Sequence, residues 1–552
     1  MRHPLKKTLI IFFSVIILIV GLGFYIKEKP NNSWSNEFKN KKNYVVYDGD
    51  VLDYQGIIKD KEIYIPYELI KDKIDPYIYN DTKINNLIIT NDDHVIRIEN
   101  GTGIVWDNGE RKQSTTRAFK QDETWYVPLS LLKDYYPVSI TYSKDSQLFS
   151  LHLLTEERKT STIKEDKKQN IRSEATVKGS INAVVSPKEK VFVLQARDGW
   201  TLIQKENGKY GYIKSDSLSS SKTLPKTTVK KAEKKTPAIN GKINLVWELI
   251  SQGTIDTATI PPMEGVNVVS PTWYSLADGD GNIKSIADPA YVAWAHSRGY
   301  QVWGLFSNDF DPSITKQMLH NYNARQRTIS QLTTYATQHQ LNGINLDFEN
   351  VHTEEKDSLV QFIRELTPVF HAKGLFVSID VTPISSSEMW SNFLNREAIG
   401  KTVDYMALMA YDEHWESSPK SGSVASLPWT EQSVTNLVGQ VPHSKVILGM
   451  PTYTRMWKEE NGKVSSDVFA MMDTRNWLIS HNLRPTEDSK TGQNYVEIKE
   501  GNATYKIWIE DHKSLTKRVD LVHEYDLAGV GIWERKYTLN ETWKVISDAL
   551  HK

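Results

Sequence analysis

Two acidic residues, Asp347 and Glu349, stand two positions apart at the end of the apolar run "LNGINLDFEN". Side chains on a strand alternate between its two faces, so Asn345, Asp347 and Glu349 would share one face. No Lys or Arg lies nearby in the sequence to neutralise these acids, and burying unpaired polar groups costs free energy. The spacing therefore favours a catalytic pair over the alternative, an ordinary polar strand end.

Such a pair suits acid–base chemistry on a substrate that brings its own nucleophile. Adjacent carboxyls repel each other and burial disfavours their charged forms, so one of them can stay protonated near neutral pH, as a general acid requires. Ordinary retaining glycosidases place an acid and a carboxylate nucleophile on opposite sides of the bond they cut. Two acids on one strand approach from the same side, which favours a nucleophile within the substrate.

The segment that must position these acids runs from Ile239 to the C-terminus and is long enough for a barrel of alternating strands and helices. Eight apolar, strand-like runs recur in it, with helical patterns between many of them. We therefore predict a (β/α)8 TIM barrel over residues 239–552 rather than a doubly wound open sheet. The runs are 242–249, 265–274, 301–308, 343–350, 375–383, 403–412, 445–453 and 529–534.

Polar side chains gather where these predicted strands end. In a barrel of this kind the carboxyl ends of the strands form the rim that carries the active site. We therefore expect any chemistry of the acid pair at that rim. The polar residues at the strand ends are Asn308, Glu349, Asp412, Tyr453 and Glu534.

Four of these strands carry motifs that resemble family 18 glycoside hydrolases, which include chitinases and bacterial cell-wall N-acetylglucosaminidases. "NGINLDFE" is similar to the family's D-G-x-D-x-D-x-E, and "MAYD", Met409 to Asp412, is similar to M-x-Y-D. "GMPTYTR" resembles G-x-P-x-Y-G-R, with Thr454 in place of Gly, and "GIWE" contains the Trp of the eighth strand, Trp533. The resemblance extends over most of residues 239–552 and implies an α+β insertion at about 456–508.

The resemblance implies a role for each matching residue. Glu349 would protonate the leaving oxygen and later activate water, and Asp347 would hold the N–H of the sugar's acetamido group. Tyr411 would steady the acetamido carbonyl while an oxazolinium ion forms. Asp412 and Tyr453 would line the site, and Trp533 would stack beneath the sugar. No metal and no cofactor is expected.

The sequence departs from the family signature at two positions. Asn342 and Asn345 replace its first two acids. Asn345 can form hydrogen bonds with neighbours and substrate but cannot take up a proton, so we expect a different rate or pH optimum. An asparagine here, with the residues after the sixth strand, is similar to the Bacillus-type branch associated with spore cortex and cell-wall hydrolysis.

The first 30 residues predict a membrane anchor. The basic stretch "MRHPLKK" precedes an uncharged apolar run, Thr8 to Tyr25, whose length is about what a helix needs to cross a bilayer. A cleaved signal peptide is the alternative, with Gly21-Leu22-Gly23 as a poor cleavage site. In both cases the remaining chain lies outside the cytoplasm, facing the cell wall.

Two small modules are expected between the anchor and the barrel. Residues 42–155 contain an internal repeat and resemble amine-oxidase N-terminal-like α+β domains, whereas 169–218 resembles a bacterial SH3-like β-barrel. Its aromatic residues fit either a ligand groove or the core of the barrel. Residues 156–168 and the Lys-, Pro- and Ser-rich stretch 219–238 read as linkers. The aromatic residues are Trp200, Tyr210 and Tyr212.

Length and composition narrow the function. A chain of 552 residues predicts two to four domains, the net charge of −1 gives no signal for nucleic acid, and the absence of Cys excludes disulfides. We expect a monomeric, membrane-tethered O-glycosyl hydrolase that cuts N-acetylglucosamine linkages in peptidoglycan. Chitin or chito-oligosaccharides are the alternative substrates. An inactive glycan-binding barrel and a scaffolding surface protein are the non-enzymatic alternatives.

Overall fold

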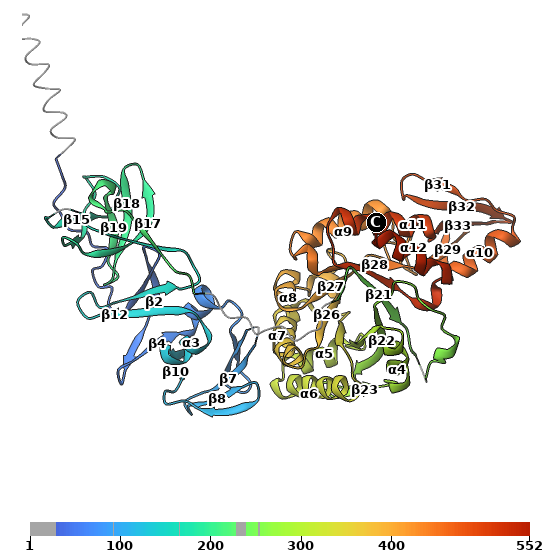
Figure 1. Ribbon diagram of the computed structural model, residues 1–552, viewed down its shortest axis with the longest axis horizontal. Helices are drawn as coiled ribbons and strands as arrows, with labels where there is room; N and C mark the ends of the chain where they lie inside the picture. Colours follow the sequence, from blue (N-terminus) through green and yellow to red (C-terminus); the bar gives the residue numbers. More distant parts are fainter. Residues whose placement is uncertain (1–28, 92, 165, 228–238, 252–253) are drawn as a thin grey trace, which may run out of the picture. The chain divides into compact units, whose positions relative to one another are not determined.

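The computed structural model describes residues 29–91, 93–164, 166–227, 239–251 and 254–552. These residues form two compact units, and segments 81–84 and 90–95 group with the C-terminal one (Figure 1). The predicted anchor at residues 8–25 lies outside the described residues. Among those described, no helix is long and apolar enough to span a membrane.

Within the described part of residues 239–552, eight parallel strands close into a barrel, as predicted (Figure 1). The first strand, β21, pairs with both β22 and the last strand, β34, which closes the ring. Each strand coincides with one of the eight apolar runs. The strands are β21 (Ile243–Glu248), β22 (Val268–Leu276), β24 (Gln301–Ser307), β25 (Gly343–Asp347), β26 (Phe376–Val381), β27 (Tyr405–Met409), β28 (Val446–Pro451) and β34 (Gly529–Trp533).

Helices follow most of the strands and cover their outward-facing side chains. On β25 the outward residues Ile344 and Leu346 are fully buried, and Phe348 just beyond packs on Phe362 of α7. Acid or amide side chains cap the backbone N–H groups that begin several of these helices. The helices are α4 (Pro289–Ser297), α5 (Pro312–Leu319), α6 (Tyr322–Gln338), α7 (Lys356–Ala372), α8 (Arg396–Thr402), α9 (Leu427–Val438), α11 (His512–Glu524) and α12 (Asn540–Leu550).

The inside of the barrel is layered. Apolar side chains such as Leu245, Trp303 and Ile447 fill the lower part, and Trp247 belongs to the same cluster. Polar residues lie above them, toward the carboxyl ends of the strands. The apolar side chains therefore pack beneath the polar residues that line the rim of the barrel.

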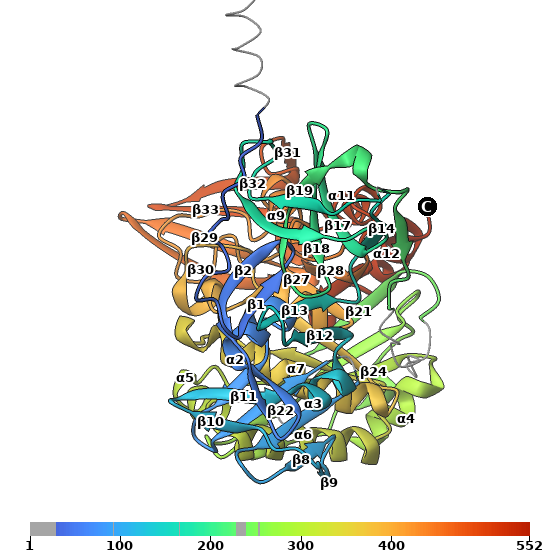
Figure 2. The ribbon, with the colours of Figure 1, turned by 90° about the vertical axis from the view of Figure 1, so that its left-hand side faces the viewer.

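An insertion interrupts the barrel between β28 and β34, close to the predicted 456–508. It contains a five-stranded antiparallel sheet in the order β30-β29-β33-β32-β31, which Figure 2 shows in this order, and the helix α10. Its elements are β29 (Tyr453–Glu460), β30 (Lys463–Ala470), α10 (Met471–Ser480), β31 (Thr486–Asp488), β32 (Gln493–Glu500) and β33 (Ala503–Ile509).

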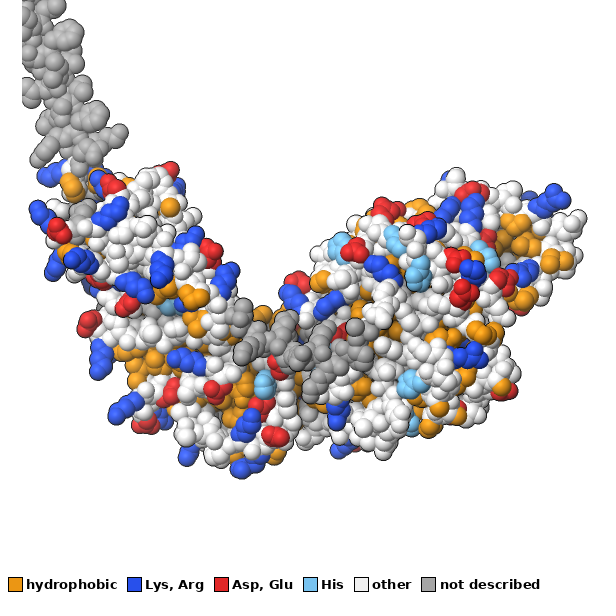
Figure 3. All heavy atoms as spheres, viewed as in Figure 1, with side chains coloured by type: hydrophobic (Ala, Val, Ile, Leu, Met, Phe, Trp, Pro, Cys, Tyr) orange, Lys and Arg blue, Asp and Glu red, His pale blue; other side chains and the backbone are white. Residues whose placement is uncertain are grey.

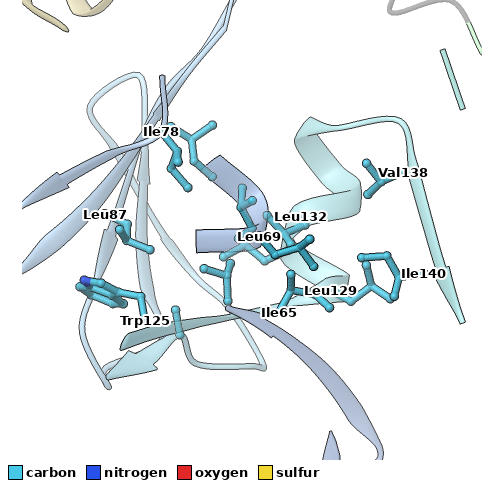
Figure 4. Packing of buried hydrophobic residues seen from close by; sticks show 14 of the residues in the cluster. Ile65, Leu69, Ile78, Leu87, Trp125, Leu129, Leu132, Val138 and Ile140 are labelled. Carbon is cyan, nitrogen blue, oxygen red and sulfur yellow. The ribbon is translucent and has the colours of Figure 1, made fainter. Parts of the chain in front are cut away.

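The N-terminal unit contains the internal repeat as two paired strands. β4 (Glu62–Pro66) and β11 (Thr124–Pro128) run antiparallel with Val127 opposite Ile65, and each ends in a proline that begins a short helix, α2 (Tyr67–Leu69) or α3 (Leu129–Tyr135). The two helices and strands share one apolar core, shown in Figure 4. The repeat therefore folds as one module.

Further strands complete this module. Two four-stranded sheets have the orders β12-β13-β1-β2 and β10-β11-β4-β3, and a five-stranded sheet has the order β5 to β9. The additional bounds are β1 (Tyr44–Tyr47), β2 (Asp50–Gln55), β3 (Ile57–Lys59), β5 (Tyr79–Asp81), β6 (Asn86–Thr90), β7 (Val95–Glu99), β8 (Ile104–Asp107), β9 (Glu110–Gln113), β10 (Phe119–Gln121), β12 (Val138–Ser143) and β13 (Leu148–Leu153).

The predicted SH3-like segment lies in a sheet that is larger than expected. Its strands belong to a seven-stranded sheet in the order β16-β15-β19-β18-β17-β14-β20. β14 (Arg158–Thr162) and β20 (Lys222–Leu224) come from stretches predicted as linkers. Backbone pairing needs little apolar side chain, so their charged composition did not reveal them. The remaining strands are β15 (Gln169–Arg172), β16 (Ile181–Val185), β17 (Lys190–Arg197), β18 (Trp200–Lys205) and β19 (Tyr210–Lys214).

The aromatic residues of this sheet differ in burial. Tyr210 is buried beside Val46 and Leu148, and its hydroxyl donates to a carboxylate oxygen of Glu37 at 2.7 Å. Trp200 and Tyr212 are only half-buried. Tyr210 is thus buried against the preceding module and is not part of the separate apolar cluster formed within the SH3-like segment. Figure 3 shows Lys and Arg interspersed with Asp and Glu on the visible face of each unit, consistent with the net charge of −1.

Candidate active site

Strand β25 carries the predicted acid pair to the rim of the barrel. Asn345 and Asp347 alternate with the buried apolar residues Ile344 and Leu346, so they face the barrel interior. β25 ends at Asp347, and Glu349 follows in the connection to α7. The predicted alternation is therefore found for Asn345 and Asp347, whereas Glu349 lies beyond the end of the strand.

Glu349 is fixed through its own peptide group. The buried side chain of Asn308, just beyond β24, accepts a hydrogen bond from the Glu349 N–H at 3.0 Å and donates to the Glu349 carbonyl at 2.8 Å. The same amide nitrogen lies 2.9 Å from the hydroxyl oxygen of Thr315. This clamp holds the backbone and leaves the Glu349 carboxyl available.

Asn345 is held by three neighbours inside the barrel. Its side-chain oxygen accepts from the indole N–H of Trp247 at 2.9 Å and from the Ser270 hydroxyl at 3.0 Å. Its side-chain nitrogen donates to a carboxylate oxygen of Asp380 at 2.8 Å. Both hydrogen-bonding ends of the amide are therefore engaged.

The acids at the rim are electrostatically strained. Burial raises the pKa of Asp347 from 3.8 to about 7. Burial, followed by the neighbouring carboxylates Asp347 and Asp412, raises the pKa of Glu349 well above its usual range. A protonated Glu349 beside an Asp347 that ionises more readily is the division of charge that a general acid needs.

The predicted residues from other strands surround the pair. Tyr411 follows β27 and stacks on Trp533 at the end of β34, with ring centroids 6.4 Å apart and planes inclined by 20°. The hydroxyl of the buried Tyr453 donates to Asp412 at 2.5 Å. Burial raises the pKa of both tyrosines, so they remain neutral donors.

Comparison with known proteins identifies the domain that holds this site. Residues 303–537 match the family "Glycosyl hydrolases family 18". The barrel is a family 18 glycosyl hydrolase domain. In the N-terminal unit, residues 45–151 match "Copper amine oxidase N-terminal domain", which confirms the resemblance predicted for that module.

Relatives of the family 18 domain include a glycosylase, a cortical fragment-lytic enzyme and chitinases. The chain is 27% identical to the uncharacterized glycosylase YvbX of Bacillus subtilis over 48% of this chain and 80% of that protein. It is 21% identical to the cortical fragment-lytic enzyme of Bacillus subtilis over 45% of this chain and 58% of that protein. A chitinase structure from Chromobacterium violaceum has the same fold, with a TM-score of 0.50, 20% identity, and coverage of 56% and 100% of the two chains. The chain therefore carries a glycosidase.

One acid of the site was missed in the sequence. Asp380 lies on β26, is 2% exposed and is a neighbour of Asp347. In the sequence Asp380 is a single acid inside the apolar run "LFVSIDVTP". The run alone does not show which residue of the neighbouring strand lies beside it. Asn308 was noted only as a polar strand end, without its clamp on Glu349.

Asn342, the other departure from the signature, lies away from this site. It precedes β25, at the opposite end of the strand from Asp347. Its side-chain oxygen accepts from the Val302 N–H at 2.8 Å and lies 3.0 Å from a ring nitrogen of His296. Asn342 therefore supports the bottom of the barrel.

Among the described residues, no group of three or more His, Asp or Glu side chains is arranged to hold a metal ion.

Proposed function

We propose that the chain is an extracytoplasmic glycosidase that cuts β-1,4-linked N-acetylglucosamine bonds in peptidoglycan by a retaining, substrate-assisted reaction. The observation that carries this proposal is that Asp347 ends β25 and Glu349 follows two residues later, close enough for the charge of Asp347 to raise the pKa of the Glu349 carboxyl. Both reach the substrate from the same side, so neither stands opposite the other as a nucleophile. The acetamido group of the sugar then supplies the nucleophilic oxygen.

In the first half of the reaction, Glu349 gives its proton to the glycosidic oxygen as the bond to the anomeric carbon breaks. The acetamido carbonyl oxygen forms the new bond to that carbon, which yields an oxazolinium ion and the released sugar chain. In the second half, Glu349 takes a proton from water as the water oxygen attacks the anomeric carbon. The ring opens, the acetamido group is restored, and Glu349 is protonated again.

Asp347 is suited to hold the acetamido N–H during these steps. The Asp347 side chain is half-buried, and one of its carboxylate oxygens is buried without a donor among the described residues. The other oxygen is therefore the one that is open to a substrate N–H, and that hydrogen bond to a carboxylate would be charge-assisted. Tyr411 can donate its hydroxyl to the acetamido carbonyl, and the half-exposed Trp533 offers an indole face beneath the sugar ring.

Peptidoglycan is favoured as substrate by the similarity to the Bacillus cortical fragment-lytic enzyme. Chitin or its oligomers would fit the same chemistry. We further propose that residues 8–25 anchor the chain in the membrane as a monomer, with both units facing the wall. An inactive glycan-binding barrel is the non-enzymatic alternative, but it has no need for a buried, protonated Glu349.

The proposal is tested by mass spectrometry of fragments released from purified peptidoglycan and, separately, from N-acetylglucosamine oligomers. We expect wall fragments that end in a reducing N-acetylglucosamine, and none from the Glu349→Gln variant, which still binds. Reducing N-acetylmuramic acid ends would point to a different bond. Release from the oligomers alone would favour chitin. Equal release of fragments by the wild type and the Glu349→Gln variant would contradict the proposal that Glu349 catalyses hydrolysis.

A further inference from the structure

Asp380 and Asp347 are adjacent across two neighbouring strands. In the parallel pairing of β25 with β26, Leu346 lies opposite Ile379, and the next residue on each strand is the acid. Paired residues on adjacent strands point to the same side of the sheet. Asp380 is therefore the inward-facing carboxyl beside Asp347, one strand further around the barrel.

The orientation of Asn345 shows that Asp380 accepts a hydrogen bond there. An indole N–H can only donate, so the amide oxygen of Asn345 must face Trp247 and its nitrogen must face Asp380. This donor engages one oxygen of Asp380. The amide of Asn345 supplies a hydrogen bond but has no proton to exchange with a neighbouring acid.

Carboxyl and phenol groups dominate the titratable surroundings of Asp380. Asp347 and Glu349 face it from β25 and its extension, and Tyr411 faces it from the end of β27. Burial, followed by the charge of Asp347, raises the pKa of Asp380 well above its usual range. Two buried carboxyls side by side cannot both be ionised, so they hold a proton between them.

We propose that Asp380 is a positioning residue that shares one proton with Asp347 and so stabilises the negative charge of Asp347. No covalent bond changes: the proton stays between the two carboxyls while the second oxygen of Asp347 receives the substrate N–H. Asp380 acts only through Asp347 and does not touch the sugar. This inference rests on the proposed function.

The test is the pH dependence of kcat/KM for Asp380→Asn, which keeps the size of the side chain and an oxygen that accepts from Asn345. A shared O–H···O⁻ bond is stronger than the N–H···O⁻ bond an amide offers. We therefore expect Asp347 to ionise at higher pH in the variant, which moves the acidic limb of the profile upward. We expect kcat to fall ~10- to 100-fold through misplacement of Asp347, with KM nearly unchanged. An acidic limb that stays in place or moves to lower pH overturns the inference.

Asp404→Asn is the matched control. Asp404 is also buried in the barrel, but it precedes β27, at the end away from the rim, where it binds His371. This variant should lower stability and leave the pH profile of the folded enzyme in place. If it shifts the limb as Asp380→Asn does, the shift is general and the inference falls.

Infrared difference spectroscopy tests the same proton without any activity. At neutral pH the wild type should show the C=O stretch of a buried carboxylic acid that Asp380→Asn lacks, and no such difference overturns the inference. Should Asp380→Asn fail to fold, the same band must shift in Asp347→Asn, and an unchanged band overturns it. If the wild type releases no sugar, the proposed function is wrong. The infrared measurement still tests whether Asp380 and Asp347 share a proton.

Discussion

Two groups of acids in the barrel domain differ in whether a cation accompanies them. Glu510, just after β33, accepts hydrogen bonds from Arg518 of α11 at 2.6 and 2.8 Å, and from Gln493 and Ser514, each at 2.8 Å. Arg518 also donates to the Ala425 carbonyl. The rim acids, Asp347, Glu349 and Asp380, have one another as charged neighbours instead.

The difference separates a structural acid from a reactive one. Burial raises the pKa of Glu510 as well, but Arg518 and Ser514 oppose the rise and engage both carboxylate oxygens. At the rim no cation is among the causes of the pKa shifts of Asp347, Glu349 and Asp380; only hydrogen bonds lower the pKa of Asp380, and one oxygen of Asp347 has no donor among the described residues. A satisfied ion pair fixes chain segments, whereas an unsatisfied group of acids retains binding capacity for a substrate.

The largest expected effect distinguishes the rim acid Glu349 from the ion-paired acid Glu510, and it is tested by comparing the Glu349→Gln and Glu510→Gln variants. Removing the proton donor at the rim should lower the hydrolysis rate by ~10²- to 10⁴-fold and leave the melting temperature unchanged or raised, since a buried carboxyl is lost. Glu510→Gln should lower the melting temperature and keep the rate per folded molecule. Initial rates and thermal unfolding measure both, and equal destabilisation by the two changes would contradict the contrast.

The ion pair itself can be broken from its basic side. Arg518→Met leaves Glu510 buried without its cation, which should cost about 3–5 kcal/mol of unfolding free energy. The double variant Arg518→Met/Glu510→Gln should recover much of that loss, because no unpaired charge remains. Urea unfolding, followed through the transition that coincides with loss of activity, measures the difference. A double variant as unstable as the single one would show that packing, not charge, dominates there.

The sequence predicted the barrel and the main acids because both follow from local patterns. Apolar runs of strand length revealed all eight strands, and alternation along one strand placed Asp347 on its inner face, whereas Glu349 lies beyond the end of that strand. Asp380 could not be placed, because its neighbour depends on the register between two strands. Register in a closed barrel is set by the stagger of the whole ring, which no single run encodes.

The same limit explains the other misses. The clamp joins the side chain of Asn308 to the backbone of Glu349, 41 positions away, and a contact made by a backbone group leaves no trace in residue type. The strands β14 and β20 pair through their backbones although their side chains are largely polar. In each case the sequence showed a polar residue or a charged stretch but not its partner.

Asp347→Asn tests the rim through the pH dependence of stability. The pKa of Asp347 rises from 3.8 to about 7, so the folded state keeps its proton over a range where the unfolded state has lost it. Stability should therefore fall as pH rises from 4 to 7, by about 1.4 kcal/mol per pH unit at most for this group, and less because the side chain is partly exposed.

The Asp347→Asn variant should show a shallower slope in thermal unfolding measured at several pH values. Asp526→Asn is the control: Asp526 is exposed, and its hydrogen bond with Lys242 lowers its pKa, so it is ionised in both states above pH 5. A slope unaffected by Asp347→Asn would mean that the rim acids are not strained in the free enzyme.

The Asn308→Ala variant tests how Glu349 is positioned in the absence of a neighbouring cation. Arg518 fixes Glu510 through its carboxylate, whereas Asn308 fixes Glu349 through its peptide group and leaves the carboxyl available. Losing the clamp should cost about 1 kcal/mol of stability and lower kcat by ~3- to 10-fold, with little change in KM, since the carboxyl of Glu349 remains but is less precisely positioned.

Asn244→Ala is the matched control, because Asn244 is equally buried but its side-chain atoms lack hydrogen-bond partners among the described residues. Steady-state kinetics that show the same kcat for both variants would mean that the strand end alone aims Glu349.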